Sequence, residues 1–255
     1  MNAIVGLCEL LVGCAYLVFG AIALHEMRTE RADRGPSHFG LAFALMTFTC
    51  GPHHIDHGLH LFDGGRFTWA GAFAIAASVP PGFIFLRLRL EVLSGGSGDR
   101  FYLGASRRIA LVGPCGAAVA ALVLAVAVGT RSSHLNPIDI LIAILLAVIY
   151  GAIGLKVLYT QVVHRQIFGG WSLAGGALAA IMLTCALTHM CHALAGRPDL
   201  HSRIIDGLGL PAAAYQLWVI ERLRRHAIRD WKRPNVVGRA MQPRRPSPWL
   251  GRLPG

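Results

Sequence analysis

Apolar residues fill long stretches of this chain, and polar residues gather in the short segments between them. Seven of these stretches are about 20 residues long, the length at which an α-helix crosses the hydrocarbon core of a bilayer. We therefore expect an all-α integral membrane protein with about seven transmembrane helices. The expected spans are residues 3–24, 38–62, 67–88, 108–129, 138–158, 170–195 and 205–221.

The composition and the placement of charge agree with membrane spans. Charged residues make up 15% of the chain and hydrophobic residues 54%, whereas about a quarter of a soluble domain is charged. With the C-terminus in the cytoplasm, the cytoplasmic segments hold 20 of the 24 Lys and Arg residues and the outer loops hold 4. This distribution follows the positive-inside rule, places the N-terminus outside, and explains the net charge of +11 without nucleic acid.

The charge pattern also predicts location and domain organisation. We expect a multi-pass protein of the cell (plasma or inner) membrane, with the lipid bilayer as its surroundings. Residues 1–92 form a first three-helix unit, 93–136 a cytoplasmic loop and a spacer helix, 137–222 a second three-helix unit, and 223–255 a basic, disordered cytoplasmic tail.

The second expected span is unusual because its sequence, TFTCGPHHIDHGLH, carries one cysteine and four histidines. At about 100° per residue, Cys50, His54 and His57 share one narrow helix face, and His53 and His60 flank it as possible additional ligands. Ionisable side chains at membrane depth are costly and therefore indicate a functional site. Thiolate and imidazole are soft donors that suit Cu(I) or Zn(II), so we expect this face to bind a metal ion.

Two polar residues of the first expected span match this face in depth. Glu9 and Tyr16 are seven residues apart and share a face of their own helix. Glu9 lies about as deep as His54 and His57, and Tyr16 about as deep as Cys50. We expect the Glu9 carboxylate to orient an imidazole from behind and Tyr16 to lie beside the thiolate, with ordinary packing as the alternative for Tyr16.

The sixth expected span repeats the pattern of the second. TCGPHHIDH corresponds to TCALTHMCH, so Cys185, His189 and His192 each follow a residue of the first set by 135 positions. Tyr150 follows Tyr16 by 134 positions. Two copies of a C-x3-H-x2-H pattern at one depth indicate an internal repeat whose two units have the same orientation.

The second copy is poorer in polar residues than the first. It has no counterpart of His53 or His60, and Ala143 stands where Glu9 would recur. Asp139, one turn nearer the outside, is the nearest substitute. We therefore expect the first unit to hold the richer site.

The repeated pattern resembles the ethylene-binding domain of plant and cyanobacterial ethylene receptors. In that three-helix transmembrane domain, the second helix holds Cu(I) through a cysteine and a histidine four residues later. Cys50 and His54 match this pair, and Cys185 and His189 repeat it. The resemblance implies a Cu(I) site, a small apolar gas as ligand, and a dimeric assembly that duplication within one chain would replace.

Residues of the first span extend the resemblance. Glu9 stands where the family has an aspartate in its first helix, seven residues before a tyrosine that Tyr16 matches. His53, His57 and His60 have no place in the family motif. Copper binding is therefore the property that the resemblance implies most directly.

Three functions follow from this pattern. The first is a non-enzymatic, Cu(I)-binding receptor or sensor module that passes its state to a cytoplasmic protein partner or acts as a homo-oligomer. The second is a membrane oxidoreductase or electron carrier, because facing histidines of the second and sixth spans would supply two axial ligands to haem b. In that case Asp56 and the extra histidines complete a second site for another transition metal. The third is copper transport or buffering by two like sites near the midplane.

Overall fold

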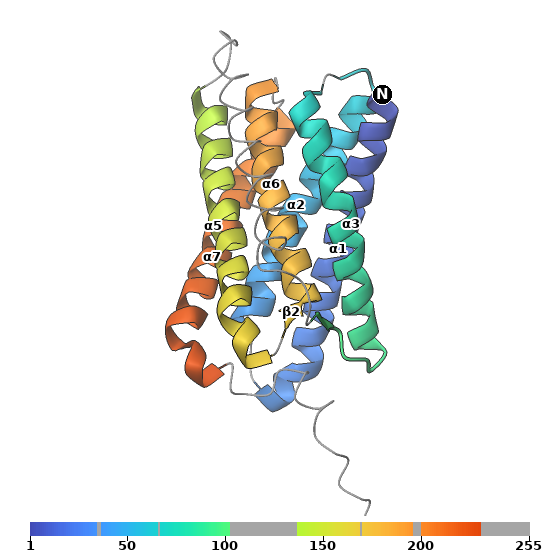
Figure 1. Cartoon of the computed structure of the whole chain (residues 1–255). Helices are drawn as coiled ribbons and strands as arrows, with labels where there is room; N and C mark the ends of the chain where they lie inside the picture. The colour runs from blue at the N-terminus through green and yellow to red at the C-terminus, as the bar shows by residue number, and fades with distance from the viewer. Residues whose placement is uncertain (35–36, 66, 103–136, 169, 196–199, 231–255) are drawn as a thin grey trace, which may run out of the picture.

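The computed structural model describes the chain except for residues 35–36, 66, 103–136, 169, 196–199 and 231–255 (Figure 1). The described part contains six long helices: α1 (Asn2–Arg34), α2 (His38–Phe62), α3 (Trp69–Leu93), α5 (Pro137–Phe168), α6 (Leu173–Ala195) and α7 (Leu200–Asp230). Two strands of two residues each, β1 (Phe101–Tyr102) and β2 (Trp171–Ser172), pair antiparallel at one end of the bundle. The expected all-α class is therefore confirmed for the described residues, apart from this short ladder.

Six of the seven expected spans coincide with helices, and the span at 108–129 lies outside the described residues. Within the described part, four helices are long and apolar enough to cross a membrane: Asn2–Thr29 of α1, Trp69–Leu93 of α3, Pro137–Val163 of α5 and Leu173–Cys191 of α6. The histidines of α2 and the charged residues of α7 lower the mean hydropathy of those two helices. The helices fit an integral membrane protein, while the count of seven spans and the in–out topology remain predictions.

The outside of the bundle is apolar, as contact with lipid requires. Large hydrophobic side chains are exposed along several helices, where they would meet water in a soluble protein. Examples from four helices are Leu7, Leu11, Phe73, Val148, Leu155 and Leu208.

The helices close into a ring in the order α1, α2, α7, α5, α6, α3 and back to α1, each packed against the next. Exchanging α1 with α5, α2 with α6 and α3 with α7 leaves this set of neighbours unchanged. Figure 1 shows by its colours that α1, α3, α5 and α7 run in one direction and that α2 and α6 run in the other. Helices α1–α3 and helices α5–α7, which we call the two three-helix units, therefore run in the same sequence of directions and are in contact through α2–α7 and α3–α6. That the two units are repeats of one another remains a prediction.

Glycines bring α1 and α2 very close together. A Cβ atom at Gly13 would lie 2.8 Å from the carbonyl oxygen of Gly51, and one at Gly58 would lie 3.0 Å from that of Gly6. Membrane helices approach this closely only where small residues leave room for the backbone. Glu9 lies on α1 between these two contacts, and its carboxylate reaches α2.

Candidate metal centre

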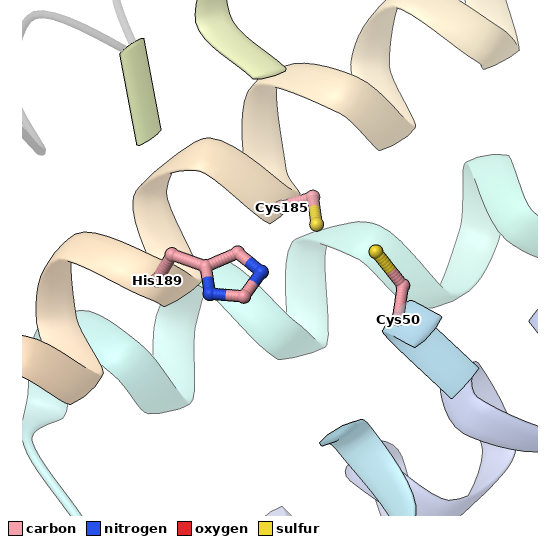
Figure 2. A group of neighbouring side chains, drawn as sticks. All are labelled: Cys50, Cys185 and His189. Carbon is pink, nitrogen blue, oxygen red and sulfur yellow. The ribbon is translucent and has the colours of Figure 1, made fainter. Parts of the chain in front are cut away.

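The two cysteines of the repeated pattern meet in the centre of the bundle. Sγ of Cys50 on α2, Sγ of Cys185 on α6 and a ring nitrogen of His189 on α6 all lie within 4.8 Å of one another. All three residues are buried, and Figure 2 shows the thiols and the imidazole directed toward a common point. Two sulfur atoms and one nitrogen are a soft donor set. We call these three residues the sulfur group.

Each cysteine of the sulfur group lies beside the tyrosine of the other three-helix unit. The Tyr150 hydroxyl and Cys50 Sγ share a hydrogen bond of 2.8 Å, and the Tyr16 hydroxyl contacts the Cys185 thiol. The Tyr150 ring also stacks on the His189 imidazole, with 5.4 Å between centroids. The sequence predicts that Tyr16 lies beside the thiolate of Cys50. In the structure, its hydroxyl contacts the thiol of Cys185, which belongs to the opposite unit.

Glu9 contacts the two histidines of α2 that match it in depth. Its Oε2 lies 2.5 Å from Nδ1 of His54, and its Oε1 lies 3.0 Å from Nδ1 of His57. A carboxylate at Nδ1 keeps the proton on that nitrogen and leaves a lone pair on Nε2. His54 Nε2 is buried and has no hydrogen-bond partner among the described residues. His54 Nε2 is therefore oriented to donate its lone pair to an ion, although His54 is not a member of the sulfur group.

A second group of side chains that could hold a metal ion adjoins the sulfur group. Asp206 Oδ1 on α7 lies 2.7 Å from His53 Nδ1 and 3.8 Å from His189 Nδ1. The rings of His53 and His189 are 4.6 Å apart between centroids, and the ligand atoms of all three residues lie within 4.8 Å of one another. We call these residues the carboxylate group. Reasoning from the sequence missed Asp206, although a carboxylate inside an expected span is itself a signal of function.

Other candidate residues of α2 lie nearer the end of that helix. The side chain of His57 is 21% exposed, and His60 is exposed. Asp56 contacts α7, where its carboxylate pairs with His201 Nδ1 at 2.8 Å and accepts a hydrogen bond of 3.0 Å from the Ser202 hydroxyl. None of these three residues of α2 belongs to the sulfur group.

Two further residues that the sequence singles out in the second unit are His192 and Asp139. The side chain of His192 lies outside the described part of the structure. Asp139, the nearest substitute for Glu9, pairs with Arg203 Nε at 2.8 Å across the α5–α7 contact. The histidine-orienting role of Glu9 therefore has no counterpart at Asp139 in this arrangement.

A narrow apolar pocket lies beside Tyr16, between α1, α3 and α6. Its volume is about 10 Å³, close to the space that one small molecule of the size of water requires. Ile181 lines it from α6 and Gly82 from α3. A Cβ atom at Gly82 would meet nothing within 4 Å, so the missing side chain keeps this wall open.

No protein-family model, no curated protein and no solved structure matches the chain. Its function is therefore inferred from the chemistry of the two groups, and the resemblance to the ethylene-binding domain remains a prediction.

Proposed function

We propose that this protein binds Cu(I) through Cys50, Cys185 and His189 in the interior of a membrane helix bundle. The supporting observation is the convergence of two thiols and an imidazole, from two different helices, in a buried place. With metal–sulfur bonds of about 2.3 Å, two sulfurs on one ion lie at most about 4.6 Å apart. The observed spread of ligand atoms, within 4.8 Å, is near that limit.

The number and softness of the donors favour copper over zinc. Structural Zn(II) sites take four protein ligands, whereas the sulfur group supplies three. Soft thiolates select Cu(I), and imidazole suits it as well. The burial of all three residues also shields the group from water and competing ligands.

The two three-helix units together support a shared site. The helix exchange that preserves the ring also exchanges Cys50 with Cys185 and Tyr150 with Tyr16. We propose that the chain arose by duplication of a three-helix unit, and that one chain carries what two units of a dimer would provide.

The same proposal gives the protein the role of a receptor or sensor for a small apolar gas. The pocket beside Tyr16 is apolar and small, and the Tyr16 hydroxyl contacts a proposed copper ligand, Cys185. A small apolar molecule from the lipid would reach the surroundings of the copper by this route. In the cell membrane, a change at the site would pass to a cytoplasmic partner through the helix ends.

Copper transport or buffering is the second candidate, favoured by a separate observation. Ionisable side chains continue from the sulfur group toward the end of α2, through His54, Glu9 and His57 to Asp56. Such a series offers successive ligands to a moving ion. Copper uptake into vesicles containing the purified protein would support transport. Uptake equal to that of empty vesicles would contradict transport and favour the sensor function.

Metal analysis of the detergent-purified protein tests the copper proposal. The variants are Cys50→Ala and Cys185→Ala, with Cys191→Ala as the matched control, because Cys191 is also a buried cysteine of α6 and lies outside the sulfur group. We expect one copper per chain in the wild type and in the control, and none in either of the other variants. Two coppers per chain in the wild type and one in each of these single variants would instead indicate two separate sites. A Soret band unaffected by the variants would indicate haem.

A further inference from the structure

The carboxylate group consists of His53 on α2, His189 on α6 and Asp206 on α7, three helices that the ring arrangement brings together. We propose that this group is a second metal site, selective for a divalent ion of borderline softness such as Zn(II). The inference does not depend on which metal the sulfur group holds, because His53 and Asp206 take no part in that group.

The geometry of the carboxylate group fits a small divalent ion. Zn–N and Zn–O bonds of about 2.0–2.2 Å in a tetrahedral arrangement place ligand atoms about 3.3 Å from one another. The distances from Asp206 Oδ1 to the Nδ1 atoms of His53 and His189 are 2.7 and 3.8 Å, which bracket this value. Each of these two distances lies within about 0.6 Å of the tetrahedral value.

Burial distinguishes the carboxylate group from an ordinary surface pair. The side chains of His53 and His189 are 6% and 3% exposed, whereas that of Asp206 is 18% exposed. The imidazoles are thus shielded, while the carboxylate stays accessible from the end of the bundle. Three protein ligands with one accessible side leave room for a water molecule or another small ligand, as in Zn(II) sites that are not purely structural.

The donor atoms separate the two groups in their choice of metal. Imidazole with carboxylate suits Zn(II) and other divalent ions, whereas two thiolates favour Cu(I). One negative charge from Asp206 also offsets part of the charge of a divalent ion at a depth where uncompensated charge is costly. Without a metal, the same residues would form a pair between protonated His53 and Asp206, which is the competing interpretation.

His189 belongs to both groups and links them. Its Nδ1 faces Asp206, and its imidazole is directed toward the two sulfurs in Figure 2, which leaves Nε2 to the sulfur group. Ligation of two metals at once would require the neutral imidazole to release its one ring N–H proton to solvent and to bridge the two ions as imidazolate. Filling one site therefore changes the affinity of the other.

Zinc titration of the full chain in detergent tests the second site. The background is the double variant Cys50→Ser/Cys185→Ser, which removes the sulfur group. We expect one Zn(II) per chain, and an affinity about 100-fold or more lower after Asp206→Asn is added, since the loss of even an outer-sphere partner costs about 10–100-fold. Asp56→Asn is the matched control, because its carboxylate also lies 2.8 Å from a histidine Nδ1, but at the exposed His201.

Cobalt gives the test a second measurement. Co(II) in the double-cysteine variant should show ligand-field bands without sulfur-to-cobalt charge transfer, and His53→Gln should remove them even where Asp206→Asn does not fold. Absence of zinc binding, or equal binding by Asp206→Asn and Asp56→Asn, would overturn the proposal. Zinc binding in a protein that takes up no copper would instead contradict only the proposed copper function.

Discussion

The Tyr150 hydroxyl lies 2.8 Å from the sulfur of Cys50, although the two residues are 100 positions apart and belong to different three-helix units. Tyr16 meets Cys185 in the converse way. Because each cysteine contacts the opposite unit, neither unit completes the surroundings of its own sulfur. The candidate site is therefore a property of the six-helix arrangement.

Replacing Tyr150 by phenylalanine should weaken copper binding without abolishing it. The hydroxyl contacts a proposed ligand directly, and loss of such a partner costs about 10–100-fold in metal affinity, while the ring can still stack on His189. Competition with a Cu(I) chelator measures the change. Tyr215→Phe is the control, since its hydroxyl bonds to His38 Nδ1 at 2.8 Å at the start of α2. Equal affinities in the two variants would contradict the assigned role of Tyr150.

The two histidines that the receptor motif makes equivalent should differ in importance. His189 is a member of the sulfur group, whereas His54 contacts Glu9. We expect His189→Gln to lower copper affinity by about 100-fold or more and His54→Gln by about tenfold at most. The same chelator competition measures both. A larger loss in His54→Gln would show that the metal is held by the α2 pair, as in the receptor family.

Filling the apolar pocket should separate gas binding from copper binding. Gly82→Leu would place a side chain in the open space beside Tyr16 without touching the sulfur group. We expect the copper content to be unchanged and the binding of ethylene, used as the probe, to be lost. Gly176→Leu, at an exposed helical glycine that also has nothing within 4 Å, should retain both. Ethylene binding that survives Gly82→Leu would contradict the proposed route.

The close α1–α2 contact should be sensitive to a single methyl group. A Cβ atom at Gly13 would lie 2.7 Å from Ile55 and 2.8 Å from a backbone oxygen, so Gly13→Ala should cost about 1–3 kcal/mol of stability. Gly207→Ala on α7 meets nothing within 4 Å and should be neutral or stabilising by up to about 1 kcal/mol. Thermal unfolding in detergent compares the two. Similar melting temperatures would contradict tight packing at Gly13.

The helices and several of the site residues could be predicted from the sequence because both depend on local spacing. The apolar runs predicted the first residue of five of the six described helices to within three residues, and that of α7 to within five. The depth of Glu9 relative to His54 and His57 predicted that these side chains face one another. The short β1–β2 ladder was not predicted, because strands of two residues leave no periodic pattern to detect.

The way in which the helices close into a ring could not be predicted in this manner. Spacing within one helix does not reveal that α2 packs against α7 and α3 against α6. For the same reason, the meeting of Cys50 with Cys185 and the approach of Asp206 to His53 become visible only in three dimensions. Asp206 lies near the start of the least apolar expected span, where a carboxylate can equally belong to a polar helix end at the membrane surface.

X-ray absorption spectroscopy of the copper-loaded protein tests the central claim most directly, because it counts the sulfur and nitrogen atoms bound to the metal. The proposed site of Cys50, Cys185 and His189 predicts Cu(I) with two sulfur ligands and one nitrogen ligand in the wild type, and no bound copper in Cys185→Ala. A single sulfur ligand that is unaffected by Cys185→Ala would contradict the shared site and would indicate that Cys50 and His54 bind the metal.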